Sequence, residues 1–368
     1  MTEKSRRTIA IDARSISSST GTYVERLLAH LQEIDRLNDY VVLLRESDAG
    51  YWTPKYSNFS TQIAEFDNYS VAEQVGFKRF LENANFDLVH FCMPQQPVWY
   101  KGKTVTTFHD LTLLKTYNSD KNWAVFRLKQ LVGRFVFRKV ARDTNAIVVP
   151  SRFTEKELVA FSPPSSRKIT LTYESAERVA LDPEPMDLPF STFLLYVGSQ
   201  SDYKNIAKLA EAHQKLRKIY PELGLVLAGK LDDAAQRNRS RFERAGYESI
   251  LFTGFVSDGQ RDWLYQNTAV YVFPSLMEGF GLPGLEAMLS GAPVASSNAT
   301  CLPEIYGDAA VYFDPTDANQ IAQKIGMVLD SPQFASELVT RGHQQAASYS
   351  WRRMAEQTHV VYESVLAV

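Results

Sequence analysis

Cysteine is scarce in this sequence of 368 residues: Cys92 and Cys301 are the only two, and they lie far apart without metal-ligand spacing. This argues against a disulfide framework or a cysteine-based zinc site, and two reduced thiols are typical of a cytosolic protein. Apolar runs are short, since none approaches the roughly 20 residues that a membrane-spanning helix needs. The first seven residues also lack the apolar stretch of a secretory signal. We therefore expect a cytoplasmic protein whose contact with a membrane would be peripheral.

Neither sign of charge dominates, because 40 basic residues are set against 42 acidic ones, giving a formal net charge of −2. This balance gives no reason to expect nucleic acid as a partner. Glycine (18) and proline (16) are too sparse for a fibrous or disordered chain, and 45% apolar with 22% charged residues is typical of a globular protein. The length exceeds what one hydrophobic core usually organises, so two domains are expected.

Short runs rich in Val, Ile, Leu and Phe alternate with helical patterns, as buried parallel strands and their crossover helices do. The first series predicts strands at residues 8–12, 40–44, 87–91, 104–108 and 146–150, with helices at 21–34, 70–82 and 122–142. After a proline-rich connector at 181–189, the second series predicts strands at 193–197, 224–228, 250–252, 269–273, 293–296 and 310–313. Residues 348–366 have the spacing of an amphipathic helix. The sequence thus predicts two doubly wound α/β units, which bind ligands beyond the carboxyl ends of their strands.

The most informative segment is residues 272–286, where a strand, a glycine-containing loop and the start of a helix follow one another. Pro283 stands in the first helical turn, a position that tolerates its missing N–H, and the free amides there can hold an anion or sugar hydroxyls. Glu286 can turn its carboxylate back toward the loop, where it would accept bonds from ribose hydroxyls. Glu278 stands in the loop itself. The alternative left open is that Glu286 only interacts with the helix dipole and that Glu278 is a solvated loop residue.

Three further places join a strand to a helix. Lys204 lies between the strand at 193–197 and a helix that begins at residue 206, an arrangement suited to a diphosphate. Gly21 lies in the first such loop, which lacks the G-x-G-x-x-G fingerprint and so argues against an NAD-dependent dehydrogenase. His109 and Asp110 end a strand, although a histidine there is often only structural.

The segment 121–142 is basic and carries no acidic residue. Aromatic and aliphatic side chains interleave with its basic residues, which are Lys121, Arg127, Lys129, Arg134, Arg138, Lys139 and Arg142. Such a segment can contact anionic lipid or a lipid-diphosphate acceptor at the inner face of a membrane. An ordinary core helix with a solvated basic face is the alternative.

Together these segments resemble the retaining GT-B glycosyltransferases of glycosyltransferase family four, a group that includes many bacterial mannosyl- and other hexosyltransferases. The likeness runs over almost the whole chain, and its most specific part is the segment of Glu278 and Glu286 followed by residues 291–294 and 302–310. It implies two Rossmann-like domains facing each other across a cleft: an acceptor domain at 1–181 and a nucleotide-sugar donor domain at 190–347. A C-terminal helix at 348–368 would pack back on the first domain.

The resemblance implies transfer of a hexose from a GDP- or UDP-sugar to a saccharide or lipid-linked acceptor in cell-surface glycan synthesis, without cofactor or metal. It places Glu286 on the donor ribose, Lys204 on the diphosphate, Gly21 near the phosphates, Val256 near the base and His109 against the transferred sugar. The expected donor-binding residues are Gly21, Gly198, Lys204, Lys230, Val256, Glu278, Gly279, Phe280, Gly281, Leu282 and Glu286. Those expected to carry the transfer are His109, Glu278 and Lys204.

Two positions depart from the family pattern, because Tyr203 and Ser199 stand where many members have basic residues. Neutralisation of the phosphates would then rest on Lys204, with Lys230 or another basic residue. This departure leaves open a nucleotide-sugar-binding partner without turnover, and an epimerase or phosphorylase of the same plan is a further alternative. For transfer we expect departure and attack on one face of the sugar, with His109 positioning it and Asp110 only a formal nucleophile.

Overall fold

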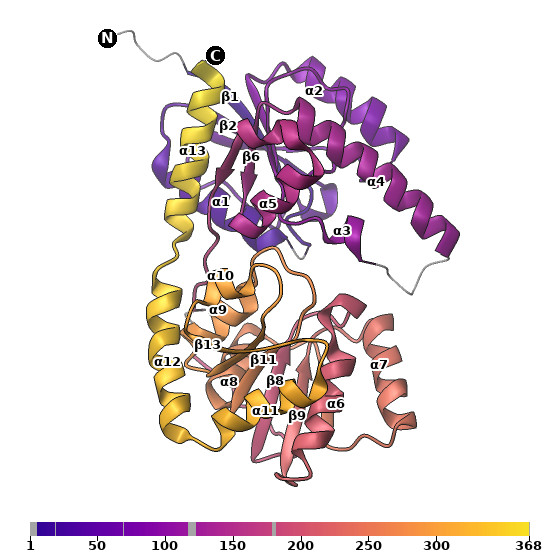
Figure 1. Cartoon of the computed structure of the whole chain (residues 1–368). Coiled ribbons are helices and arrows are strands. Elements are labelled where there is room, and N and C mark those ends of the chain that lie inside the picture. Colours follow the sequence, from indigo (N-terminus) through magenta and orange to yellow (C-terminus); the bar gives the residue numbers. More distant parts are fainter. Residues whose placement is uncertain (1–5, 19, 69, 117–122, 179–181, 368) are drawn as a thin grey trace. The chain divides into compact units, whose positions relative to one another are not determined.

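The computed structural model describes residues 6–18, 20–68, 70–116, 123–178 and 182–367, with only the backbone described at 123–126 and 128–129. The chain divides into two compact units, each built on its own sheet (Figure 1). The first unit consists of Met1–Leu114, Leu128–Glu174 and Ser350–Val368, and the second of Lys115–Arg127 and Ser175–Tyr349.

The first sheet has seven parallel strands in the order β3-β2-β1-β4-β5-β6-β7. Its strands are β1 (Thr8–Asp12), β2 (Asp39–Leu44), β3 (Phe59–Ile63), β4 (Leu88–Phe91), β5 (Thr104–Thr107), β6 (Ala146–Val149) and β7 (Ile169–Leu171). The helices in this part of the chain are α1 (Gly21–Ile34), η1 (Glu46–Asp48), η2 (Glu73–Phe77), α2 (Lys78–Ala84), α3 (Thr112–Lys115), α4 (Trp123–Asp143), α5 (Arg152–Phe161), η3 (Pro163–Arg167) and α13 (Trp351–Ala367).

Burial explains which strands of this sheet the sequence reveals. The central strands β1, β4, β5 and β6 are covered on both faces, so almost every residue is apolar or small. The edge strand β3 exposes four of its five residues, and β7 has only three residues, none of them fully buried. Neither edge strand was predicted, because neither forms an apolar run. The predicted helix at 70–82 is present but contains the π-helical turn η2 before α2.

The second sheet has six parallel strands in the order β10-β9-β8-β11-β12-β13. Its strands are β8 (Thr192–Val197), β9 (Leu223–Ala228), β10 (Ile250–Gly254), β11 (Val270–Phe273), β12 (Val294–Ser297) and β13 (Ala310–Phe313). The helices of this part are η4 (Asp202–Lys204), α6 (Ile206–Leu216), α7 (Asp233–Arg244), α8 (Asp258–Asn267), α9 (Leu282–Leu289), α10 (Leu302–Tyr306), α11 (Ala318–Leu329) and α12 (Pro332–Ala347). All six strands lie where the sequence predicts them, with small differences at their ends.

Each sheet has one place where the order of strands reverses along the chain. In the first sheet this switch lies between β1 and β4, and in the second it lies between β8 and β11. At such a switch, the loops that follow the two strands diverge and leave room for a ligand at the carboxyl edge of the sheet. Candidate site residues are therefore expected in the loops after β1, β4, β8 and β11.

The C-terminal helix α13 belongs to the first unit although the second unit precedes it in sequence (Figure 1). It packs along α1, and its buried face includes Trp351, Met354 and Tyr362. Tyr362 Oη lies 2.5 Å from Nδ1 of His90 in β4, and His359 Nε2 lies 3.0 Å from Oδ2 of Asp35 at the end of α1. The prediction that the tail folds back on the first domain is confirmed.

Candidate functional site

The loops after β8 and β9 approach each other so closely that glycine is required in both. A Cβ on Gly229, whose φ is +157°, would lie 2.2 Å from the carbonyl oxygen of Gly198. Gly198 itself has φ +141°, and its N–H donates to Ala228 O at 2.9 Å. This backbone contact sets the start of the loop that leads to Lys204.

Lys204 and Glu278, predicted from separate segments, are in direct contact at the switch of the second sheet. Lys204 Nζ donates to Glu278 Oε1 at 2.6 Å, and 15% and 12% of the two side chains remain exposed. Burial opposes the charge on the lysine, but the adjacent carboxylate outweighs it and raises the pKa of Lys204 above its usual range. The ammonium also lies 5.5 Å from the centre of the Phe273 ring. A cation is thus held, permanently charged, beside the loop that follows β11.

Backbone and amide contacts fix this arrangement. Asn205, the residue before α6, has the left-handed conformation, and its Nδ2 donates to the carbonyl oxygens of Pro274 and Pro315 at 3.1 and 2.7 Å. The N–H of Leu276 donates to Tyr203 O at 2.8 Å. The loops after β8 and β11 are therefore tied together through the residues on both sides of Lys204.

The start of α9 is shaped by Tyr306 of α10. Gly281, with φ +98°, precedes the helix, and its carbonyl accepts a 2.6 Å hydrogen bond from Tyr306 Oη. A Cβ on Gly284 would lie 2.3 Å from the same tyrosine, so this helical turn can approach it only as glycine. Pro283 lies in the first turn, as predicted. Helix α9 thus presents a rigid N-terminus, whose partial positive charge favours anions and hydroxyl oxygens.

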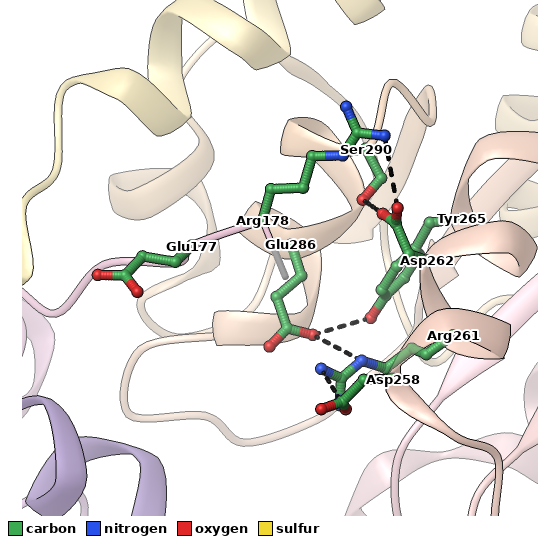
Figure 2. Close-up of a pocket in the computed structure, with 8 residues that line it drawn as sticks. All are labelled: Glu177, Arg178, Asp258, Arg261, Asp262, Tyr265, Glu286 and Ser290. Carbon is green, nitrogen blue, oxygen red and sulfur yellow. Dashed lines mark hydrogen bonds and ion pairs between the residues drawn. The ribbon is translucent and has the colours of Figure 1, made fainter. Parts of the chain in front are cut away.

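Glu286 of α9 faces helix α8 rather than Glu278. Tyr265 Oη donates to its Oε2 at 3.2 Å, and Arg261 Nε lies 4.0 Å from the same oxygen (Figure 2). Burial opposes the charge on Arg261, but Glu286 together with Tyr265, Asp258 and Asp262 outweighs it and raises the pKa of the guanidinium. These residues line a pocket that is completed by Glu177, Arg178, Asp258, Asp262 and Ser290. Sequence reasoning missed Arg261 and Tyr265, because nothing in the spacing of α8 shows which helix it faces.

The other predicted donor residues lie on the loops and helix starts of the same unit. Lys230 is exposed in the loop after β9, and Val256 is half-buried between β10 and α8. Gly279 and Phe280 are buried, and the Phe280 ring meets Tyr349 edge-on at 5.6 Å. Leu282 begins α9. The whole donor set of the second unit therefore lies beyond the carboxyl ends of β8 to β11.

A groove beside η4 offers additional positive charge. It is lined by Asp202 of η4 and by the exposed face of α7, with Arg237, Arg241 and Arg244 at helical spacing. Ser199 and Tyr203 stand where many family members have basic residues, so another basic residue is expected to help to neutralise the phosphates. These arginines are candidates for it. The part of the chain that the structure describes contains no cluster of three His, Cys, Asp or Glu suited to a metal ion.

In the first unit, Gly21 begins α1 at the switch of the sheet. Its N–H donates to Ser18 O at 2.9 Å, and a Cβ there would lie 1.8 Å from Ile16 O. Glycine is therefore required at this position by packing alone. The family resemblance predicts that this loop lies near the phosphates of the donor.

His109 lies two residues beyond the end of β5. Its Nδ1 is 3.1 Å from Glu174 Oε1, its Nε2 is 3.0 Å from Cys92 O, and the ring of Tyr23 meets it edge-on at 4.8 Å. Thr154 of α5 donates to the His109 carbonyl at 3.1 Å. The sequence predicted His109 but not Glu174, because 65 residues separate the two and β7, the strand before Glu174, went unrecognised.

Helix α4 carries the predicted basic segment, of which Lys121 and Asn122 lie outside the described residues. Leu131, Val132 and Phe135 are 65%, 49% and 55% exposed, while Val136 and Phe137 are buried in the core. Six exposed side chains of α4 form one stripe along the helix: Arg127, Leu131, Arg134, Phe135, Arg138 and Arg142. The structure thus shows a helix with both a core face and an exposed face that mixes apolar and basic side chains. No helix among the described residues is long and apolar enough to cross a membrane.

Two family models match the chain: glycosyl transferases group 1 over residues 190–345 and glycosyltransferase family 4 over residues 20–174. The O-antigen chain mannosyltransferase B of Escherichia coli is 30% identical over 71% of this chain and 70% of that protein. The serotype-specific mannosyltransferase WbdA of Escherichia coli is 31% identical over 69% of this chain, which spans only 32% of that relative.

Solved structures share the fold. Sucrose-phosphate synthase from Thermosynechococcus elongatus matches with a TM-score of 0.78 at 20% identity, over 98% of this chain and all of that one. HepE of Anabaena, in complex with UDP and glucose, matches with a TM-score of 0.75 at 14% identity, over 98% and 100% of the two chains. The predicted GT-B fold class is confirmed.

Proposed function

We propose that this chain, which belongs to glycosyltransferase family 4, transfers a hexose from a nucleotide-diphosphate sugar to a saccharide or lipid-linked acceptor in cell-surface glycan synthesis, with mannose the first candidate. The two relatives named above are mannosyltransferases, one of them of the O-antigen chain, and HepE was solved with UDP and glucose. Both support a nucleotide-activated hexose as the donor.

The Lys204–Glu278 contact carries this proposal. A donor diphosphate that reaches Lys204 competes with Glu278 for the ammonium and so frees that carboxylate to accept hydroxyls of the sugar. As the bond to the sugar breaks, negative charge grows on the diphosphate. Lys204 and the N-terminus of α9 lie fixed at this edge of the sheet and stabilise that charge in the transition state.

Glu286 then holds the ribose. Its carboxylate retains Tyr265 and Arg261 as neighbours, so it is oriented before the donor arrives and has acceptor capacity left for two hydroxyls. In the first unit, His109 faces the transferred sugar, and departure and attack take place on the same face with retention. The residues near the acceptor are carried by the first unit.

The test starts with calorimetric binding of UDP, GDP, ADP and their hexoses, followed by donor hydrolysis and transfer to saccharide and lipid-linked acceptors. Base-selective binding with slow hydrolysis and acceptor-dependent transfer supports the proposal. Binding without hydrolysis or transfer favours instead a partner protein without turnover, the alternative that Ser199 and Tyr203 raised. A change of the sugar without any acceptor would indicate an epimerase.

We also propose that the exposed stripe of α4 contacts anionic lipid, which would place the enzyme at the inner face of the membrane. Apolar side chains that are half exposed and interleave with arginines suit the boundary between headgroups and acyl chains. Each arginine near such a surface contributes about 1 kcal/mol of attraction. Arg138 stacks on the ring of Phe161, and Arg142 pairs with Asp143.

Co-sedimentation with vesicles tests the lipid contact. Binding to phosphatidylcholine vesicles that contain phosphatidylglycerol is expected to fall in the variant L131S/F135S and to disappear for phosphatidylcholine alone. Val360 of α13 is 66% exposed on another helix, so V360S is the matched control. Equal binding of L131S/F135S and V360S would show that α4 is only a core helix with a solvated face.

A further inference from the structure

Both ring nitrogens of His109 face hydrogen-bond acceptors. Nε2 lies 3.0 Å from the carbonyl oxygen of Cys92, which can only accept, and Nδ1 lies 3.1 Å from Oε1 of Glu174. A neutral imidazole has one N–H and cannot donate to both. The contacts are therefore satisfied together when the ring is an imidazolium and Glu174 is a carboxylate. Only 16% and 6% of these two side chains remain exposed.

The other groups around the ring agree with this protonation state. Burial opposes the charge, but the hydrogen bond and charge of Glu174, helped by the Cys92 carbonyl and by Asp110, raise the pKa of His109 above its ordinary value. Tyr23 packs edge-on against the ring while its hydroxyl bonds to Thr107. His90 of β4 is uncharged near neutral pH because burial and the charge of His109 lower its pKa to about 3.

Glu174 occupies a particular place in the chain. It lies three residues after β7 ends and is the last residue of the first-unit segment Leu128–Glu174, after which the chain passes into the second unit at Ser175. Its contact with His109 ties this exit point to the loop after β5. We propose that Glu174 is a positioning residue for transfer, holding the His109 ring charged and in one orientation at the carboxyl edge of the first sheet. This inference rests on the proposed function, in which His109 faces the sugar.

Protonation and geometry are coupled in this arrangement. When the imidazolium loses its proton, Nε2 can keep its bond to Cys92 O only if Nδ1 turns a lone pair toward the Glu174 carboxylate. That repulsion releases the ring and the chain at Glu174. Because the pKa of His109 is raised, the positioned form is complete below the ordinary value and is lost as pH rises through the raised one. The rate of transfer should therefore fall on the alkaline side.

The variant E174Q tests this on the protein itself. Glutamine keeps the shape and can still accept from Nδ1–H, but it removes the charge that favours the imidazolium. The alkaline limb of kcat is expected to move down by at least about one pH unit, a tenfold loss of rate at a pH on that limb, with KM for the donor nearly unchanged. H109N should remove the limb. An alkaline limb at the same pH in E174Q and wild type would overturn the proposal, even if E174Q were slower at every pH.

A matched control and a second readout separate the possible failures. D35N weakens another buried acid–histidine pair of the same unit, Asp35–His359, and should lower the unfolding temperature without moving the limb. Nitrogen-15 NMR of the His109 ring needs no turnover: the wild-type ring should show two protonated nitrogens at neutral pH and E174Q should titrate at lower pH. If no transfer is found, the proposed function fails, and the NMR titration alone then decides whether Glu174 holds the ring charged. Identical titration in both proteins would refute it.

Discussion

Nζ of Lys204 lies 2.6 Å from Oε1 of Glu278, a residue 74 positions later in the chain. The contact spans the switch of the second sheet, since the lysine follows β8 and the glutamate follows β11. In the proposed function, the cation that binds the diphosphate and the carboxylate that accepts the sugar hydroxyls are thus paired with each other. Both charges stay accessible enough to exchange partners, because neither side chain is fully covered.

Lys204→Ala is expected to lower kcat/KM for the donor by more than tenfold, or about 1.4 kcal/mol, because the diphosphate loses its cation. It should also lower the free energy of unfolding, since Glu278 is left unpaired. That loss should stay below the roughly 3–5 kcal/mol of a fully buried pair. Initial rates and urea unfolding measure both effects. The control is K208A on α6, whose contact with Glu211 is exposed, and donor use by K204A equal to that of K208A would rule out the diphosphate role.

Glu286→Ala is also expected to reduce donor use more than tenfold, or about 1.4 kcal/mol, through lost ribose contacts. Tyr265→Phe removes only the hydroxyl that orients the carboxylate, so a rise of a few-fold in KM with little change in kcat is expected. Tyr271→Phe is the matched control, because the structure gives that buried hydroxyl no partner among the described residues. Steady-state kinetics of the three variants measure KM and kcat for the donor. Indistinguishable KM values for Y265F and Y271F would contradict the orienting role of Tyr265.

Gly21→Ala should destabilise the first unit by about 1–3 kcal/mol, since its Cβ would overlap the Ile16 carbonyl and the loop must shift. Gly50→Ala is the comparison, because nothing lies within 4 Å of a Cβ there. Thermal unfolding should show a clear drop for G21A and little change for G50A. Unfolding at the same temperature in the two variants would mean that Gly21 is kept for a ligand alone.

Buried His90 predicts a loss of stability in mild acid. Burial and His109 lower its folded pKa to about 3, so the unfolded chain binds the proton more readily as pH falls from 6.5 toward 3. Stability at pH 5 should be lower by about 2 kcal/mol than at pH 7 from this group. His90→Gln should flatten the dependence of the unfolding free energy on pH, whereas exposed His343→Gln should not. If the unfolding free energy of H90Q depends on pH as steeply as that of the wild type, another group causes the loss of stability in acid.

The central strands and the doubly wound fold class were predictable, because central parallel strands are buried on both faces and form apolar runs in the sequence. The strands β3 and β7 escaped because an edge strand needs few buried residues: β3 shows one buried phenylalanine followed by four exposed side chains. The π-helical turn at Glu73–Phe77 was not predicted either. Its hydrogen bonds span one residue more than those of an α-helix, a difference too small for the apolar periodicity of the sequence to show.

The candidate site was predictable where the family pattern carries a residue, as for Glu278, Glu286 and Lys204. The residues that contact the predicted site residues were not predictable. Arg261 and Tyr265 reach Glu286 only because α8 packs beside α9, and Glu174 reaches His109 only because β7 lies next to β6 in the sheet. Such contacts join residues far apart in sequence, and a single chain read along its length gives no distance between them.

Helix α13 has a consequence for how the protein is made. The strands and α1 of the first unit leave the ribosome early, whereas α13, which packs along α1 and reaches β4 through Tyr362, comes after the whole stretch Ser175–Tyr349. At ordinary rates of synthesis that interval lasts roughly 10 to 35 seconds. The nascent first unit waits through it with an uncovered apolar surface, which is open to chaperones and to other growing chains.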